Sequence, residues 1–184
     1  MNELIIDEGN LQFDFTLCGK PIKFDMPGTG NSGLYAVDFV VDKEKCLLFI
    51  EVKDYQNPNT TSEERKESLE MLLSAGVLDK SIFALEMGVK IKDSLLRIYA
   101  EGGTFTKKVQ YLLFINFDVL DAEQRQHLFD KIRVQIPTGL NNSSRFPKFT
   151  EIKFRLVDSA KLKKKYGITV NASNQPMEGV GNDE

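Results

Sequence analysis

The sequence predicts an α/β fold in which helices cover a mixed central sheet. Short runs rich in β-branched and aromatic residues, at positions 34–41 and 46–53, have the composition of strands. Helical patterns follow them, and an almost continuous apolar run at 109–117 is typical of a strand buried on both faces. Strands and helices that alternate in this way favour a sheet with crossover helices.

Length and composition predict one domain. The chain has 184 residues, of which 41% are hydrophobic, and this is enough for one sizeable core. We expect the domain to span residues 1–168. Residues 169–184, which are rich in Asn, Gly and acidic side chains, are expected to form a disordered tail.

Local signals predict the other elements. Residues 11–17 and 21–24 flank the turn Cys18-Gly19-Lys20 and predict an N-terminal β-hairpin. Two helices are expected next: one that opens with a Thr61–Glu64 capping box and stops at Gly76, and one at 78–99 with a kink or break at Gly88. The strand at 109–117 is expected to be the sheet centre. It is followed by a helix from Asp121 to about residue 134, a strand at 150–157, and a closing helix at 158–166 that ends at Gly167.

The runs 34–41 and 46–53 predict a central hairpin with a charged loop. Whether the loop is Lys43-Glu44 or the four residues 42–45, the pairing places Asp38 opposite Phe49, and Ala36 opposite Glu51. Asp38 and Glu51 are then diagonal neighbours, about 7–8 Å apart.

Because side chains alternate along a strand, Asp38, Glu51 and Lys53 share one face of this hairpin. Burial of two unpaired carboxylates is costly, and a divalent cation would compensate for it. Carboxylate oxygens suit Mg²⁺. Lys53 could then orient or help to deprotonate the attacking water, or stabilise the charge that develops on phosphate oxygens.

The segments Val37-Asp38 and Glu51-Val52-Lys53 resemble the signature of the PD-(D/E)XK nuclease superfamily, which has the restriction-endonuclease-like fold. The resemblance implies a Mg²⁺-dependent nuclease, with Mn²⁺ as a substitute. It implies a nucleic acid as partner, and DNA is the expected substrate on family grounds. A homodimer would be reasonable, since two active sites can cut two strands.

Residue roles follow from the same resemblance. Asp38 and Glu51, together with the carbonyl of Val52, are implied as metal ligands, and Lys53 is implied as the catalytic lysine. Tyr55 and Gln56 are candidates for contacts with a metal-bound water or with substrate, and Gln56 could equally cap the turn that follows.

An acid on a helix before the hairpin is common in this superfamily, but strands are expected at that place here. Glu3, Asp7 and Glu8 are the upstream candidates, and Glu64 and Glu67 on the following helix could stand in for them. The pattern Glu-x-Lys also recurs at 64–66 and 151–153, but neither copy follows a strand with an aligned aspartate.

Two other interpretations stay open. One is a nuclease-like domain that no longer cleaves and serves as a binding or interaction module, which the net charge of −3 and the missing upstream acid favour. The other is an ordinary hairpin with a solvated charged face.

Composition also bears on the surroundings of the protein. Basic residues form three candidate patches that could contact nucleic acid or be simply solvated. They are Lys161, Lys163, Lys164 and Lys165; Lys90 and Lys92; and Lys107 and Lys108. No apolar stretch has the eighteen or so residues of a membrane helix, and no signal peptide is evident. A cytoplasmic protein with no membrane contact is expected, in which Cys18 and Cys46 are reduced packing residues.

Overall fold

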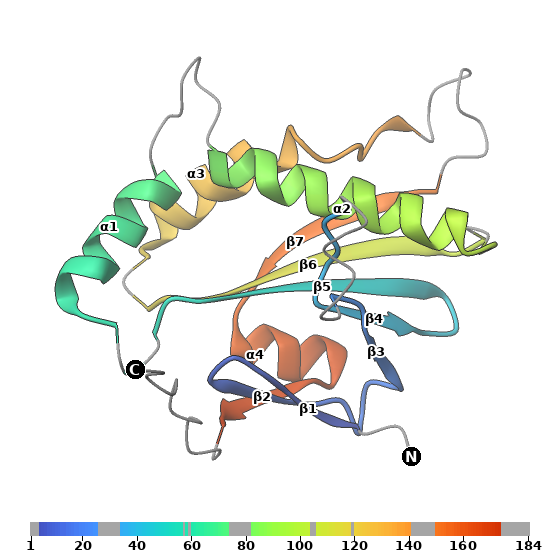
Figure 1. Cartoon of the computed structure of the whole chain (residues 1–184), viewed down its shortest axis with the longest axis horizontal. Coiled ribbons are helices and arrows are strands. Elements are labelled where there is room, and N and C mark those ends of the chain that lie inside the picture. The colour runs from blue at the N-terminus through green and yellow to red at the C-terminus, as the bar shows by residue number, and fades with distance from the viewer. Residues whose placement is uncertain are drawn as a thin grey trace, which may run out of the picture.

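The computed structural model describes residues 4–25, 34–56, 58, 60–73, 82–103, 106–118, 120–140 and 150–173 (Figure 1). They form a mixed α/β structure with two sheets, in agreement with the predicted class. In chain order the elements are β1 (Ile5–Glu8), β2 (Leu11–Asp14), β3 (Pro21–Lys23), β4 (Phe39–Asp42), β5 (Cys46–Asp54), α1 (Ser62–Leu73), α2 (Ile82–Ala100), β6 (Lys108–Asn116), α3 (Ala122–Arg133), β7 (Ile152–Val157), α4 (Ser159–Lys161), the π-helical segment η4 (Leu162–Tyr166) and β8 (Thr169–Ala172).

The larger sheet has the strand order β3-β4-β5-β6-β7. Strands β3, β4 and β5 pair antiparallel, whereas β5 pairs parallel with β6, and β6 parallel with β7. The middle strand is therefore β5, so the prediction that the run at 109–117 is the sheet centre is wrong by one strand. Strand β6 is nonetheless paired on both sides and buried, as its apolar run predicts.

The central hairpin has a different register from the predicted one. Phe39 pairs with Ile50 and Val40 with Phe49, and Lys43 N–H donates to the carbonyl of Cys46 over 2.9 Å. The loop is Glu44-Lys45, and continuing the register by one residue places Asp38 directly across from Glu51. The predicted diagonal arrangement is wrong by two residues. An even shift keeps side chains on the same face, so the predicted shared face survives.

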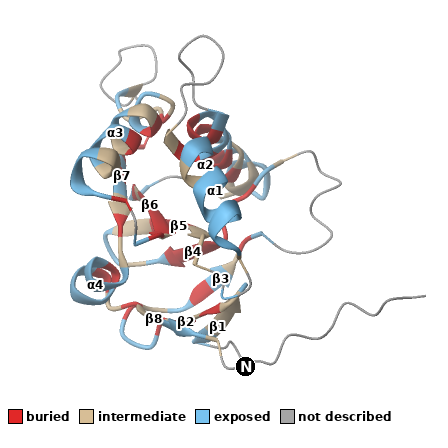
Figure 2. Ribbon diagram, turned by 90° about the vertical axis from the view of Figure 1, so that its left-hand side faces the viewer, coloured by how far each residue is buried: buried red, intermediate tan, exposed pale blue. Residues whose placement is uncertain are grey.

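Two layers cover the larger sheet, one on each face (Figure 1). Helices α1, α2 and α3 lie over one face, where Phe49, Tyr111 and Met87 belong to the larger apolar cluster. The smaller sheet and α4 lie against the other face, where Phe13 contacts Phe39 and Phe114. Figure 2 shows buried residues concentrated on the strands between these layers.

The predicted N-terminal hairpin is wrong. Strand β2 pairs with β1 and β8 in the smaller sheet, while β3 pairs with β4 in the larger one. The observed hairpin is β1–β2, which turns at Gly9 with a positive φ of 58°. Phe13 and Phe15 are fully buried against the larger sheet, and this packing separates β2 from β3.

The predicted tail begins too early. Residues 169–172 form β8, which pairs antiparallel with β2, and Phe13 faces Val170 in that ladder. Ile168 is fully buried and fixes the chain just before this strand. Residues 174–184 lie outside the described residues.

Helix boundaries follow the predicted signals closely. Thr61 and Glu64 form a capping box before α1, and Asp121 and Gln124 form one before α3. Asp158 caps α4, and Gly167 ends η4 with a φ of 74°. The predicted stop at Gly76 lies outside the described residues. No helix in the described part of the chain is long and apolar enough to cross a membrane.

Gly88 does not break its helix, since α2 continues through it. It allows a close approach instead: a Cβ added there would lie 2.7 Å from the Cβ of Gln135 and 2.9 Å from its carbonyl oxygen. The segment that follows α3 therefore packs directly onto the backbone of α2.

We expect Gly88→Ala to destabilise the protein. Alanine gains about 1 kcal/mol in helix propensity, but overpacking against a backbone atom costs about 1–3 kcal/mol or more, so a net loss of about 1 kcal/mol should appear in urea unfolding. Gly139→Ala is the control, because nothing lies within 4 Å of an added Cβ there. A Gly88→Ala protein as stable as wild type would contradict the close approach.

Candidate functional site

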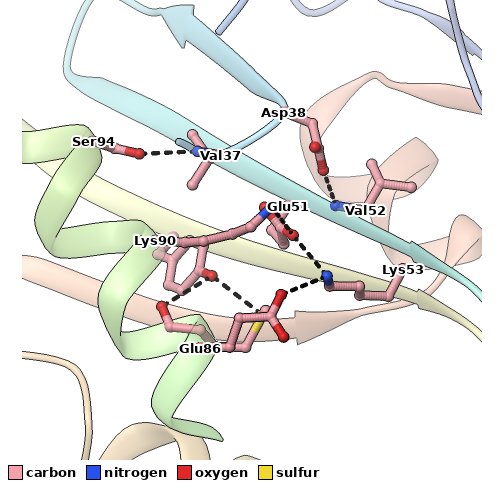
Figure 3. Close-up of polar contacts among 10 residues, drawn as sticks. Val37, Asp38, Glu51, Val52, Lys53, Glu86, Lys90 and Ser94 are labelled. Atoms are coloured by element: carbon pink, nitrogen blue, oxygen red, sulfur yellow. Dashed lines mark hydrogen bonds and ion pairs between the residues drawn. The ribbon is translucent and has the colours of Figure 1, made fainter. Parts of the chain in front are cut away.

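Asp38 and Glu51 lie side by side on the helix-covered face of the larger sheet (Figure 3). Their residues are only 6% and 0% exposed. An Oδ2 atom of Asp38 accepts a hydrogen bond from the backbone N–H of Val52 over 2.5 Å. This bond is possible because β4 begins only at Phe39, which leaves the N–H of Val52 without a strand partner on that side.

Two lysines approach a single oxygen of Glu51. Nζ of Lys90, from α2, lies 2.7 Å from Oε1 of Glu51, and Nζ of Lys53 lies 3.4 Å from the same atom. Lys53 also forms an ion pair of 2.9 Å with Glu86 of α2. The ammonium of Lys53 therefore pairs with one carboxylate of the sheet, Glu51, and one of the helix, Glu86 (Figure 3).

Both carboxylate oxygens of Glu51 are buried, and neither has a hydrogen-bond partner among the described residues. The contacts that Lys90 and Lys53 make with Oε1 are ion pairs. A buried, unpartnered carboxylate oxygen is costly and rare. It is the kind of atom that a cation would satisfy.

Burial perturbs the pKa of both carboxyls. Loss of solvent raises the pKa of Asp38 to about 6, against the opposing effect of Lys90. Loss of solvent and the charge of Asp38 raise the pKa of Glu51 to about 8. Two adjacent acids with raised pKa values mark a site that favours bound positive charge.

Lys53 stays protonated in this environment. Burial lowers its pKa, but the carboxylates of Glu51 and Glu86 together outweigh burial and raise it. Its side chain is still 23% exposed, so the ammonium is accessible from solvent.

Helix α2 fixes the segment that carries Asp38. Ser94 Oγ accepts a hydrogen bond from the N–H of Val37 over 3.0 Å, and Asp93 accepts one from Tyr35 N–H over 3.0 Å. Farther along, Arg97 donates to the carbonyl of Phe24 over 2.6 Å. Two consecutive turns of α2 thus hold the chain on either side of residues 26–33.

Sequence reasoning missed Glu86, Ser94 and Arg97 on this helix. It placed Lys90 in a basic surface patch with Lys92, and this is wrong, because Lys90 is buried. Glu86, Lys90, Ser94 and Arg97 are spaced by four, four and three positions, which puts them on one helix face. A polar stripe inside an apolar helix is the signal that marks them. Such a stripe indicates that this helix face contacts polar groups, but it does not identify them.

The two predicted residues that follow β5, Tyr55 and Gln56, lie on opposite faces of the larger sheet. Tyr55 packs against Phe117, with ring centroids 5.3 Å apart, and burial with the charges of Glu86 and Glu51 raises its pKa. Gln56 lines a cavity of about 460 Å³ on the other side, together with Asn10 and Asn116. The structure therefore places Tyr55 near the site and Gln56 away from it.

Among the upstream acids, Glu8 comes nearest to the site. Its charge contributes to the raised pKa of Asp38, and its carboxylate forms a 3.1 Å ion pair with Lys23. Asp7 accepts a hydrogen bond from Gln12, and Glu3 lies outside the described residues. Glu64 caps α1, and with Glu67 it lines a separate cavity of about 600 Å³ that also contacts Tyr55.

Within the described ranges, no group of three or more His, Cys, Asp or Glu side chains is arranged to hold a metal. Asp38 and Glu51 form a pair only. Comparison with protein-family models, with curated proteins and with solved structures finds no match to this chain. Geometry and chemistry are therefore the basis for any functional conclusion.

In metal-free buffer, stability should fall as the pH rises. The folded chain holds the Glu51 proton up to a pKa of about 8, whereas an ordinary glutamate loses it near 4.5. The folded state binds more protons between these values, so the free energy of unfolding decreases across this window. Each pKa unit corresponds to about 1.4 kcal/mol.

The measurement is urea unfolding from pH 5 to 8.5 with a chelator present. Glu51→Gln should flatten the decline, while Glu123→Gln, on the exposed surface of α3, should keep it. Equal slopes for wild type and Glu51→Gln would contradict the burial of an ionisable Glu51.

Ser94→Ala should destabilise the protein by about 1–3 kcal/mol, because it leaves the buried N–H of Val37 without its acceptor. Ser159→Ala, at an exposed position, should change stability by no more than about 0.5 kcal/mol. Chemical denaturation of both variants checks this, and equal stabilities would show that α2 does not hold this segment.

Proposed function

We propose that the protein is a metal-dependent nuclease of the PD-(D/E)XK superfamily that hydrolyses phosphodiester bonds in DNA. The observation that carries this proposal is the buried pair Asp38, directly before β4, and Glu51 on β5, with Lys53 two residues after Glu51 on the same face. A cation would offset the cost of burying these two carboxylates, and Lys53 supplies a positive charge at the edge of the site.

The residues fit a hard divalent cation. Asp38 and Glu51 offer carboxylate oxygens, and the two buried oxygens of Glu51 have no hydrogen-bond partner among the described residues. The N–H of Val52 points toward Asp38, and the carbonyl of a strand residue points to the same side as its N–H. Asp38, Glu51 and the Val52 carbonyl are thus the proposed ligands of Mg²⁺, or of Mn²⁺ in its place.

Each residue then has a defined task. A bound divalent cation polarises a phosphate oxygen and lowers the pKa of a coordinated water. Asp38 and Glu51 position that cation against the sheet. Lys53, at the partly exposed edge of the site, would bind and stabilise a phosphate oxygen, or orient the attacking water.

The strand arrangement supports the same family. Antiparallel strands β3, β4 and β5 lead through α1 and α2 to the parallel strand β6, which agrees with the αβββαβ core that the resemblance implies. The opening helix is the difference, because residues 4–25 form strands. Glu8 on β1 is the proposed replacement for the upstream acid, since its charge acts on Asp38.

A nuclease-like module that does not cleave is the second candidate. The observation in its favour is Lys90, whose ammonium already neutralises Glu51 at 2.7 Å. Such a module would keep the ion pair permanently and would bind no divalent cation at Asp38 and Glu51.

Nicking of supercoiled plasmid with Mn²⁺ tests the proposed activity, alongside a linear end-labelled duplex for exonuclease action. Asp38→Asn, Glu51→Gln and Lys53→Ala should each lower the rate by about a hundredfold or more, since each removes a group that acts on the reacting phosphate. Calorimetry with Mn²⁺ should show binding by wild type, and none by the Asp38→Asn, Glu51→Gln double variant.

The Glu-x-Lys copy at 151–153 provides the control. Glu151 pairs with Lys108 and Lys153 in an exposed setting, so the Glu151→Gln and Lys153→Ala variants should keep full activity. Absence of Mn²⁺ binding by wild type would overturn the nuclease proposal in favour of the silent module.

A further inference from the structure

Lys90 stands out among the charged residues of the described chain. Only three charged residues there are buried, namely Asp38, Glu51 and Lys90, and they lie together. Lysine is seldom buried unless it is paired. The ammonium of Lys90 therefore has a specific electrostatic role in this cluster.

That role is to supply the positive charge which the acids require. Nζ of Lys90 lies 2.7 Å from Oε1 of Glu51, nearer than Lys53 at 3.4 Å. The Lys90 side chain is 10% exposed, compared with 23% for Lys53. Once Glu51 is ionised, Lys90 is therefore a nearer counter-ion than Lys53.

We propose that Lys90 is a built-in counter-ion which occupies the cation position of Asp38 and Glu51, and that a divalent metal binds only when the Lys90 ammonium withdraws. This inference rests on the proposed metal-dependent function. In this proposal the Lys90 ammonium competes with the metal for Glu51, so metal binds only above a higher concentration than it would without Lys90.

The helix offers the displaced ammonium a new partner. Glu86 lies four residues before Lys90, and a glutamate at that spacing is well placed to pair with a lysine. Glu86 is 44% exposed and at present binds Lys53 over 2.9 Å. Transfer of Lys90 to Glu86 would free Lys53 for a phosphate without any movement of the helix backbone, because the lysine side chain has four flexible bonds.

Competition of this kind lowers the apparent affinity for metal. Metal binds only the fraction of molecules in which Lys90 has left Glu51, so the apparent dissociation constant is the intrinsic constant divided by that fraction. Removal of the ammonium removes this penalty. A neutral side chain at position 90 should therefore bind metal more tightly.

Calorimetric titration of the full chain with Mn²⁺ tests the inference. Lys90→Met keeps an unbranched side chain of similar length, and should bind Mn²⁺ about tenfold or more tightly than wild type. Lys92→Met, at an exposed position of the same helix, is the matched control and should bind as wild type does.

The outcomes separate this inference from the proposed function. Equal or weaker binding by Lys90→Met, with measurable binding by wild type, overturns the counter-ion role and leaves the nuclease proposal standing. Absence of Mn²⁺ binding by wild type and by Lys90→Met overturns both.

A measurement on wild type keeps the inference testable should Lys90→Met fold poorly. Acetylation with an amine-reactive ester, followed by mass spectrometry, reports the accessibility of each lysine. Mn²⁺ should increase modification of Lys90 severalfold and leave Lys92 unchanged, and the Asp38→Asn, Glu51→Gln double variant should show no such increase. Mn²⁺ binding to wild type without a change at Lys90 overturns the inference.

Discussion

The burial of two carboxylates side by side is the constraint on which the rest of this structure depends. Asp38, which directly precedes β4, lies across from Glu51 of β5, beneath α2. Such burial costs several kcal/mol unless positive charge and hydrogen bonds offset it. The Val52 N–H and the ammonium groups of Lys53 and Lys90 provide part of this compensation. Even so, neither buried oxygen of Glu51 has a hydrogen-bond partner among the described residues.

The sheet creates this site by changing its pairing pattern at β5. On one side β5 pairs antiparallel with a strand that begins only at Phe39, and on the other it pairs parallel with β6 along its whole length. The second half of β5 therefore directs a backbone group that β4 does not use, the N–H of Val52, to the side chain of Asp38 while it stays inside the sheet. Helix α2 closes the site from above, and Ser94 fixes the approach of the chain to Asp38.

The two candidate functions differ in the position of one ammonium group. In the silent module, the Lys90 ammonium would keep its 2.7 Å contact with Glu51. With a divalent cation in that place, Lys90 and Lys53 are both available to the surroundings of the site. The proposed nuclease and the silent module thus differ in which cation lies beside Glu51. The relative affinity of Glu51 for the Lys90 ammonium and for a divalent metal decides between them.

Local chemistry in the sequence determined most elements and the composition of the site. Capping residues such as Asp121 and Thr61 act within one turn, and alternation along a strand puts Asp38, Glu51 and Lys53 on one face for any even register. The hairpin register, the placement of Phe13 and Phe15 against the larger sheet, and the residues of 169–172 as a strand were decided by tertiary packing. The same holds for Lys90 and Ser94, because a polar stripe on a helix shows that it meets a polar partner, whereas only the folded chain brings that partner within 3 Å.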